Sequence, residues 1–171
     1  MLALFEPLGS WYKVWLLLHI LSVIFGLGTV SLNGIYAAQA RVRPGPPGRA
    51  VTEANFFVSG VAEYIIYTVP IWGIFLVLAS HDAIKFSQTW VWLSLLLYVI
   101  ALGISHAVMI PGVKRIIALQ KEMEQGPPPA GGPPPQVAEL QAIGTRLGPS
   151  GMTLDLLLIV IVVLMIWKPG L

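Results

Sequence analysis

The chain contains four long stretches of almost uninterrupted apolar residues, at about 11–38, 56–78, 90–110 and 152–167. A helix needs about 20 such residues to cross the hydrocarbon core of a bilayer. Because lipid offers no hydrogen-bond partners, backbone groups inside it must pair within their own segment, which favours helices. The alternating polarity of an outer-membrane barrel strand is absent from these stretches. The sequence therefore predicts an all-α bundle of four transmembrane helices, in a single membrane domain spanning residues 1–171.

The composition supports a lipid environment and excludes several classes of protein. Hydrophobic residues make up 56% of the chain and charged residues only 11%, so a soluble fold of this length would expose large apolar faces. The lipid bilayer is thus the first expected partner. The absence of cysteine excludes disulfides, zinc–cysteine sites and iron–sulfur clusters. A net charge of +2 without a dense Lys/Arg face argues against nucleic acid as a partner.

The distribution of basic residues predicts the orientation in the membrane, because Lys and Arg accumulate on the cytoplasmic side. Three of the 10 basic residues flank the predicted outer ends, namely Lys13, Lys85 and Lys168. The other seven fall in the two remaining connections: Arg41, Arg43, Arg49, Lys114, Arg115, Lys121 and Arg146. We therefore predict both termini outside (N-out/C-out), both of these connections inside, and a location in the bacterial cytoplasmic membrane.

The connection between spans three and four has several parts. Ile116, Leu119 and Met123 recur at helical spacing, so span three is predicted to continue past Pro111 as an amphipathic helix. Residues 126–135 are almost entirely Pro and Gly, which predicts a flexible cytoplasmic linker, although such segments also dock in partner grooves. A separate short helix is expected over 137–147. Span four is then expected to start at a Ser150 or Thr153 cap, with Asp155 in its first turn.

Polar residues within span one follow one helical stripe. Their spacing of three and four residues places them on a single face: His19, Ser22, Gly26, Thr29 and Asn33. One interpretation is a groove for a cofactor or substrate. The other is a packing seam, in which small residues let helices approach and hydroxyl and amide groups bond across. His19 is the member that most needs a specific partner.

Ionisable residues inside the other spans predict a polar cluster. Glu63 lies in span two, with Ser59 and Tyr67 one turn to either side, and His106 lies in span three. From the helix rise of 1.5 Å, Glu63 and His106 lie at matching depths near the inner boundary, with Asn33 close by, whereas His19 lies more than about 10 Å nearer the outside. We predict a buried polar cluster of Asn33, Glu63 and His106, separate from His19. The depth difference argues against one haem held by both His19 and His106.

Several segments carry a resemblance to known membrane families. The chain resembles a bacterial family of four-helix integral membrane proteins of unknown function. The resemblance touches all four spans: residues 13–21 (KVWLLLHIL), residues 68–70 (TVP) with Gly73, the Trp90 and Trp92 pair, and residues 164–169 (LMIWKP). Span one is also similar to the opening helix of copper-resistance D-type and HemJ-type membrane proteins. The HemJ resemblance implies haem b bound at the equivalent histidine, which is His19.

Three classes of function remain open. The first is a non-enzymatic accessory or interaction module that associates with other membrane subunits. The second is a haem- or metal-binding bundle that uses His19. The third is a proton-coupled carrier or small membrane enzyme that uses Glu63 and His106. Because the HExxH, P-loop and GxSxG motifs are absent, we assign no catalytic residue and no metal ligand from the sequence.

Overall fold

The computed structural model describes residues 10–126, 132 and 134–169, and within these residues it contains helices and turns but no strand. Its elements are, in chain order, α1 (Ser10–Ser22), the π-helix η1 (Val23–Leu27), α2 (Gly28–Val30), α3 (Asn33–Arg41), α4 (Pro46–Leu78), α5 (Thr89–Ile104), the π-helix η2 (Ser105–Met109), α6 (Ile110–Gln125) and α7 (Pro135–Trp167). They form four rods that are long and apolar enough to cross a membrane: Trp11–Arg41, Pro46–Leu78, Thr89–Gln125 and Pro135–Trp167. The prediction of an all-α fold with four membrane-crossing helices is therefore confirmed.

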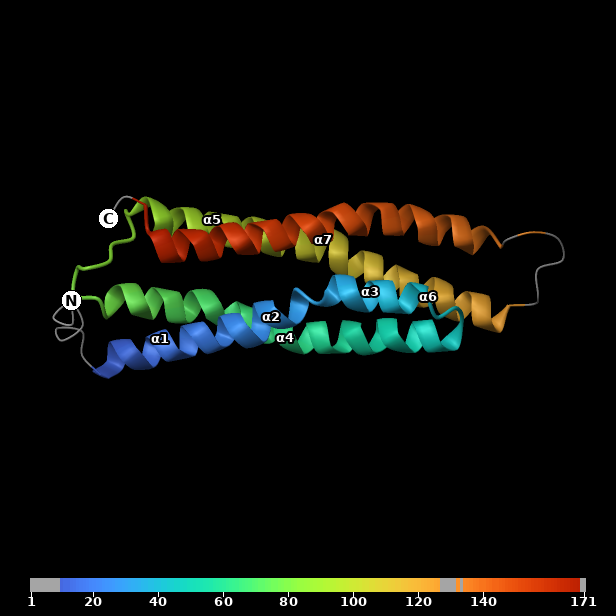
Figure 1. The fold of residues 1–171 in the computed structure, drawn as a ribbon, viewed down its shortest axis with the longest axis horizontal. Helices are drawn as coiled ribbons and strands as arrows, with labels where there is room; N and C mark the ends of the chain where they lie inside the picture. Colours follow the sequence, from blue (N-terminus) through green and yellow to red (C-terminus); the bar gives the residue numbers. More distant parts are fainter. Residues whose placement is uncertain (1–9, 127–131, 133, 170–171) are drawn as a thin grey trace.

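The four rods form two antiparallel hairpins that lie side by side (Figure 1). In the N-terminal hairpin (residues 11–78), α1 and α3 pack along α4, and in the C-terminal hairpin (residues 89–167), α5 packs along α7. We call the end that carries residues 42–45 and Gly126 the loop end, and the opposite end, where α1 begins and α7 ends, the terminal end. The two hairpins contact each other chiefly where α6 meets α4 and where α3 meets α7. These contacts lie toward the loop end.

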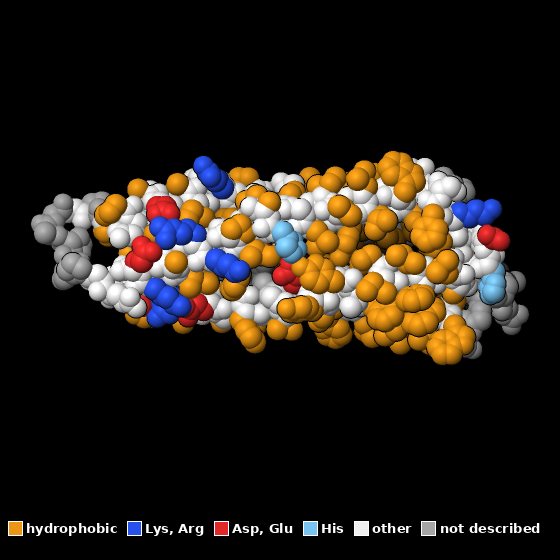
Figure 2. Space-filling view, turned by 180° about the vertical axis from the view of Figure 1, so that it is seen from behind, with side chains coloured by type: hydrophobic (Ala, Val, Ile, Leu, Met, Phe, Trp, Pro, Cys, Tyr) orange, Lys and Arg blue, Asp and Glu red, His pale blue; other side chains and the backbone are white. Residues whose placement is uncertain are grey.

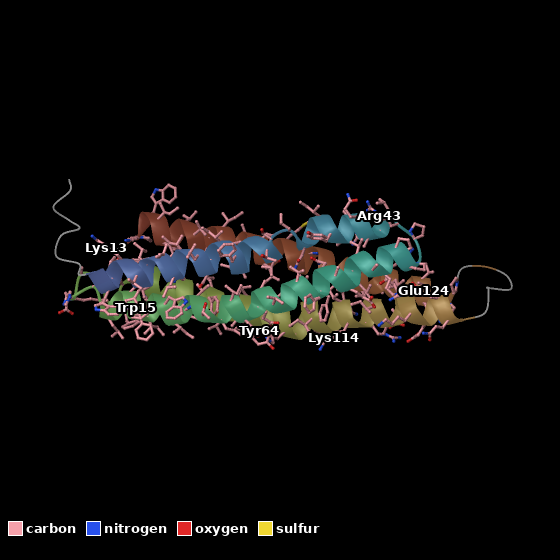
Figure 3. The ribbon with its side chains drawn as sticks, turned by 90° about the horizontal axis from the view of Figure 1, so that it is seen from below. Lys13, Trp15, Arg43, Tyr64, Lys114 and Glu124 are labelled. Atoms are coloured by element: carbon pink, nitrogen blue, oxygen red, sulfur yellow. The ribbon has the colours of Figure 1, made fainter. Side chains whose placement is uncertain are left out.

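Aromatic side chains gather at the terminal end, as expected where helices meet lipid headgroups. Trp15 stacks on Trp72 and Phe75, with ring centroids 5.6 and 4.8 Å apart, and Figure 3 shows Trp15 and Lys13 near that end. Lys168 follows the last turn of α7 and places its Nζ 5.4 Å from the centre of the Trp90 ring. This aromatic layer marks the terminal-end boundary of the apolar part of the bundle.

The rods are longer than the apolar stretches. α4 has 33 residues and is therefore about 50 Å long, whereas the hydrocarbon core of a bilayer is about 30 Å thick. Figure 2 shows that most charged side chains gather at the loop end, beyond a long surface of hydrophobic ones. The helices therefore extend beyond the apolar layer at the loop end. Which side of the membrane this end faces stays a prediction, and linker residues 127–131 and 133 lie outside the described residues.

The start of the fourth helix differs from the prediction. Instead of a short helix followed by a separate span, α7 runs without interruption from Pro135 to Trp167. Neither Ser150 nor Thr153 caps the start of a helix, because their hydroxyls donate to the carbonyls of Arg146 and Pro149 within α7. Asp155 accordingly lies in the middle of α7 and not at its start. Pro149 removes one backbone bond, but the helix continues through it, as transmembrane helices often do.

A tight turn joins α3 to α4. Gly45 adopts a φ of 75°, which glycine tolerates and other residues disfavour. A Cβ added to Gly48 would overlap the carbonyl oxygen of Arg43 and lie 2.6 Å from that of Ala40. Pro46 and Pro47 then occupy the first positions of α4, where a missing N–H costs nothing. The glycines and prolines of this turn thus allow the first two rods to approach each other closely at the loop end.

Ion pairs connect the rods at the loop end. Arg49 of α4 donates to both carboxylate oxygens of Glu124 of α6 at 3.0 Å and to Glu53 at 3.0 Å, and Lys121 lies 3.1 Å from Glu53. We call this set, together with the Arg115–Glu139 pair that joins α6 to α7 at 2.8 Å, the loop-end ion pairs. Hydrogen bonds from Lys121 and Arg49 lower the pKa of the Glu53 carboxyl, and the Arg115 guanidinium lowers the pKa of Glu139. Both carboxylates therefore favour the folded state while they remain ionised.

Candidate functional site

A cavity of about 1410 Å³ lies between the two hairpins and is lined by residues of all four rods. It extends from His19 to the level of Glu124, and most of its wall is apolar. The few polar side chains on this wall are therefore the candidates for function, because polar groups at membrane depth are costly and usually face protein or a cavity.

Pro70 creates one polar position on this wall. Because proline has no N–H, the carbonyl of Ile66 loses its usual partner one turn later in α4. The hydroxyl of Tyr98, from α5 in the other hairpin, donates to that carbonyl at 3.1 Å. Tyr98 thus satisfies a backbone group inside the membrane and links the two hairpins at the cavity.

A π-helical turn carries the histidine of the third rod. Pro111 cannot donate to the carbonyl four residues earlier, and the turn immediately before it widens into η2, where the Ile110 N–H donates to the Ser105 carbonyl. His106 lies within this widened turn, and its Nδ1 lies 2.9 Å from the carbonyl oxygen of Leu102. Single π turns are rare and often occur at functional positions.

Glu63, Tyr67 and His106, which we call the trio, meet at the cavity wall. The Tyr67 hydroxyl lies 2.6 Å from Glu63 Oε1 and 2.8 Å from His106 Nε2, and Glu63 Oε1 lies 3.0 Å from His106 Nε2. The His106 side chain is half-exposed, and that of Glu63 is a quarter exposed. Figure 2 shows a histidine beside an acidic side chain at mid-length of the molecule, on the border between the charged and the hydrophobic surface.

The contacts of the trio need one proton more than a neutral imidazole, a phenol and an ionised carboxylate carry together. The Leu102 carbonyl only accepts, so His106 Nδ1 carries a proton. The single hydroxyl proton of Tyr67 serves its bond to Glu63. The contacts of His106 Nε2 with Tyr67 and Glu63 then require a further proton on Nε2, which is shared with the Tyr67 oxygen and the Glu63 carboxylate. The trio therefore has a net charge of zero with this shared proton and minus one without it.

Other polar groups lie on the same helices as the trio or line the same cavity. On α4, Tyr64 meets the Tyr67 ring edge-on, with centroids 6.4 Å apart. Asn33 does not join the trio, because its Oδ1 accepts a hydrogen bond from Ser59 at 3.0 Å, one turn before Glu63. Asp155 of α7 lines the same cavity, and Lys114 of α6 lies two turns beyond His106 toward the loop end, as Figure 3 shows relative to Tyr64.

The polar stripe of span one faces α4. Ser22 Oγ lies 3.0 Å from Thr68 Oγ1, and a Cβ on Gly26 would lie 2.9 Å from the Ile66 side chain. Thr29 instead donates to the Phe25 carbonyl of its own helix at 2.6 Å. These contacts favour the packing-seam interpretation for Ser22 and Gly26.

His19 is held separately from the trio. Its Nδ1–H donates to the Val69 carbonyl at 2.9 Å, and Gly73 leaves room beside the ring. Histidines that bind a metal through Nε2 are often oriented by such a bond, so His19 could ligate haem iron from the cavity wall. Among the described residues, no group of three or more His, Asp or Glu side chains could hold a metal ion. Haem b at His19 stays an expectation from the resemblance.

Sequence reasoning noted Tyr67 but did not include it in the cluster, and it explained Asp155 as a helix-start charge. The sequence does contain a signal for Tyr67: it follows Glu63 by four residues, and residues at that spacing are neighbours on a helix. Asp155 is misplaced by the prediction of a separate span four that starts at a Ser150 or Thr153 cap, because α7 runs continuously from Pro135 to Trp167. The assignment of Asn33, Glu63 and His106 to one buried polar cluster stays a prediction.

Comparisons with known proteins agree with this architecture. No curated protein and no solved structure matches the chain. The matches give no support to the resemblance to copper-resistance D-type or HemJ-type proteins, which stays a prediction. One family model, described as "Predicted integral membrane protein (DUF2269)", matches residues 13–169 and thus covers three rods completely and all but the first two residues of the other. The chain therefore belongs to the DUF2269 family of integral membrane proteins.

Proposed function

We propose that this membrane protein is a proton-coupled carrier, in which the trio binds and releases one proton as a small molecule enters and leaves the cavity between the hairpins. The observation that supports this proposal is the three-way contact of Glu63, Tyr67 and His106, which needs a shared proton at the cavity wall. A group that changes charge at membrane depth is a typical element of proton relays.

Two features favour this function over a purely structural role for the trio. All three members of the trio line the cavity, so water that enters the cavity would give the shared proton a path to exchange. The trio also joins α4 to η2, which belong to different hairpins, so its protonation is linked to how the hairpins pack. The accessory-module interpretation from the sequence explains neither feature, although it remains compatible with the fold.

Histidine ¹⁵N NMR of the purified protein tests the proposal. The chain has three histidines, and His19→Gln and His81→Gln variants assign them. We expect Glu63→Gln to change the Nε2 resonance of His106 at neutral pH, because the amide cannot serve as the anionic partner of the shared proton. The resonances of His19 and His81 should stay in place as internal controls. Identical His106 resonances in the two proteins would overturn the proposal.

A further inference from the structure

The cavity wall has an uneven charge along its length. Within the apolar stretches, the described lining residues include two carboxylates, Glu63 and Asp155, and no Lys or Arg. The basic residues of the lining all lie beyond these stretches toward the loop end, namely Arg41, Arg43 and Lys114. At membrane depth the wall is therefore acidic.

The two carboxylates lie on opposite hairpins at a similar depth. From the terminal end, Glu63 lies about 22 Å below Leu78 of α4, and Asp155 about 18 Å below Trp167 of α7, at 1.5 Å per residue. The ion pairs among the described residues do not include Asp155. Because an uncompensated carboxylate at this depth is costly, Asp155 favours a positively charged occupant.

The remainder of this wall suits a bulky apolar body. Leu158, Ile161 and Val162 of α7 face the cavity from one hairpin, and the rings of Tyr67 and Tyr98 line it as well. Aromatic faces attract cations through their quadrupole, which adds to the attraction of the carboxylates. The wall thus combines the features that recognise a positive charge surrounded by hydrocarbon.

We infer that the cavity binds a lipophilic monovalent organic cation, and that its binding displaces the shared proton of the trio. This inference rests on the proposed function and names its substrate class. The exchange is balanced: the cation enters, the proton leaves to the solvent, and the trio changes from neutral to an anion paired with the cation. With the proton retained, the trio is neutral and leaves the cation without an uncompensated anionic partner in a medium of low dielectric constant. Tyr64, Tyr98, Lys114 and Asp155 are the other ionisable groups around this exchange.

Calorimetric titration of tetraphenylphosphonium into the full chain in phosphatidylcholine nanodiscs tests the inference. Titrations in two buffers with different ionisation enthalpies report the protons released per cation bound. We expect saturable binding with proton release for the wild-type protein. Glu63→Gln should abolish the proton release, whereas Asp155→Asn should weaken binding by about tenfold, equivalent to about 1.4 kcal/mol, and retain the release.

Two controls keep the outcome interpretable. Tetraphenylborate has the same shape with the opposite charge and should not bind, and Asp82→Asn, in the connection at the terminal end, should behave as the wild type. The absence of saturable tetraphenylphosphonium binding, equal binding of tetraphenylborate, or unchanged proton release in Glu63→Gln would each overturn the inference. If the calorimetric titration fails but the His106 resonance depends on Glu63, the organic cation is the wrong substrate class and the proposed proton site of the trio is retained.

Discussion

Tyr67 joins the two ionisable side chains of the trio, since its hydroxyl contacts both Glu63 and His106. Neither an isolated carboxylate nor an isolated imidazole is readily accommodated at membrane depth. The phenol supplies the proton to one contact and accepts in the other, so all three groups are satisfied together. The neighbouring Tyr64 differs: the residue is 76% exposed and meets the Tyr67 ring edge-on.

This difference predicts unequal effects of two matched substitutions. Tyr67→Phe should destabilise the protein by about 1 kcal/mol, because hydrogen bonds within membrane proteins contribute on that order. Tyr64→Phe should change the stability by less than about 0.5 kcal/mol, as is usual for exposed positions. Unfolding in mixed micelles of increasing dodecyl sulfate content measures both. Equal effects of the two substitutions would argue against a role for the Tyr67 hydroxyl.

How far the sequence predicts the site depends on the kind of evidence at each residue. Helical rise alone gives the common depth of Glu63 and His106 and the separate position of His19. It does not tell which side chain Asn33 contacts, because Ser59 and Glu63 lie one turn apart on the same face of α4. Nor does it reveal η2, since a widened turn before Pro111 follows from backbone pairing in three dimensions.

Among the helices, the connection between α3 and α4 is the most tightly constrained. The carbonyls of Ala40 and Arg43 approach Gly48 so closely that no side chain fits there. Gly103, near the end of α5 and within the third rod, has no atom within 4 Å of the position that a Cβ would take. The two glycines thus differ in what an added methyl group would meet, although both lie within helices.

Gly48→Ala is accordingly expected to destabilise the protein by about 1–3 kcal/mol, the usual cost of overpacking. Gly103→Ala should leave the stability unchanged or raise it by up to about 1 kcal/mol, because alanine favours the helix more than glycine does. Thermal unfolding followed by circular dichroism compares the two. A Gly48→Ala protein as stable as its Gly103→Ala counterpart would show that the turn relaxes freely.

The extents of the helices show what apolar patterns predict well and poorly. Each apolar stretch locates a membrane-crossing helix, because the lipid enforces backbone pairing there. Outside the lipid the pattern is weaker, and α7 continues through Pro149 where the sequence indicated two helices. There, packing of α6 against α7 favours a helix that local propensity alone does not specify.

At the scale of the whole molecule, the loop-end ion pairs join the two hairpins through α4 and α6 and join the two rods of the C-terminal hairpin to each other. Arg49 and Lys121 connect α4 to α6 through Glu53 and Glu124, and Arg115 connects α6 to α7 through Glu139. Individually, exposed pairs of this kind contribute little, but a network that spans several rods restrains their relative positions. Its contribution depends on the ionisation of the carboxylates.

The lowered pKa values of Glu53 and Glu139 set the sign of the pH dependence. Their contribution is fully present above the ordinary carboxyl pKa of 4.5 and is lost as the pH falls through the lower folded-state values. The Glu53→Gln/Glu139→Gln protein should therefore be less stable than the wild type at neutral pH, with the difference shrinking below about pH 4.5. Melting temperatures in detergent between neutral and acidic pH test this, and a difference that persists unchanged in acid would contradict it.

The uneven joining of the hairpins has a mechanical consequence. At the terminal end, residues 79–88 connect α4 to α5. The helix contacts between the hairpins lie instead toward the loop end. For a lever about 50 Å long, a rotation of about 5° at its pivot moves the far tip by roughly 4 Å, which is the scale of ordinary hinge and shear motion. A small rotation of the two hairpins about the loop end would thus widen the terminal end of the cavity with the backbone hydrogen bonds of the four rods kept intact, which is the access that the proposed carrier needs.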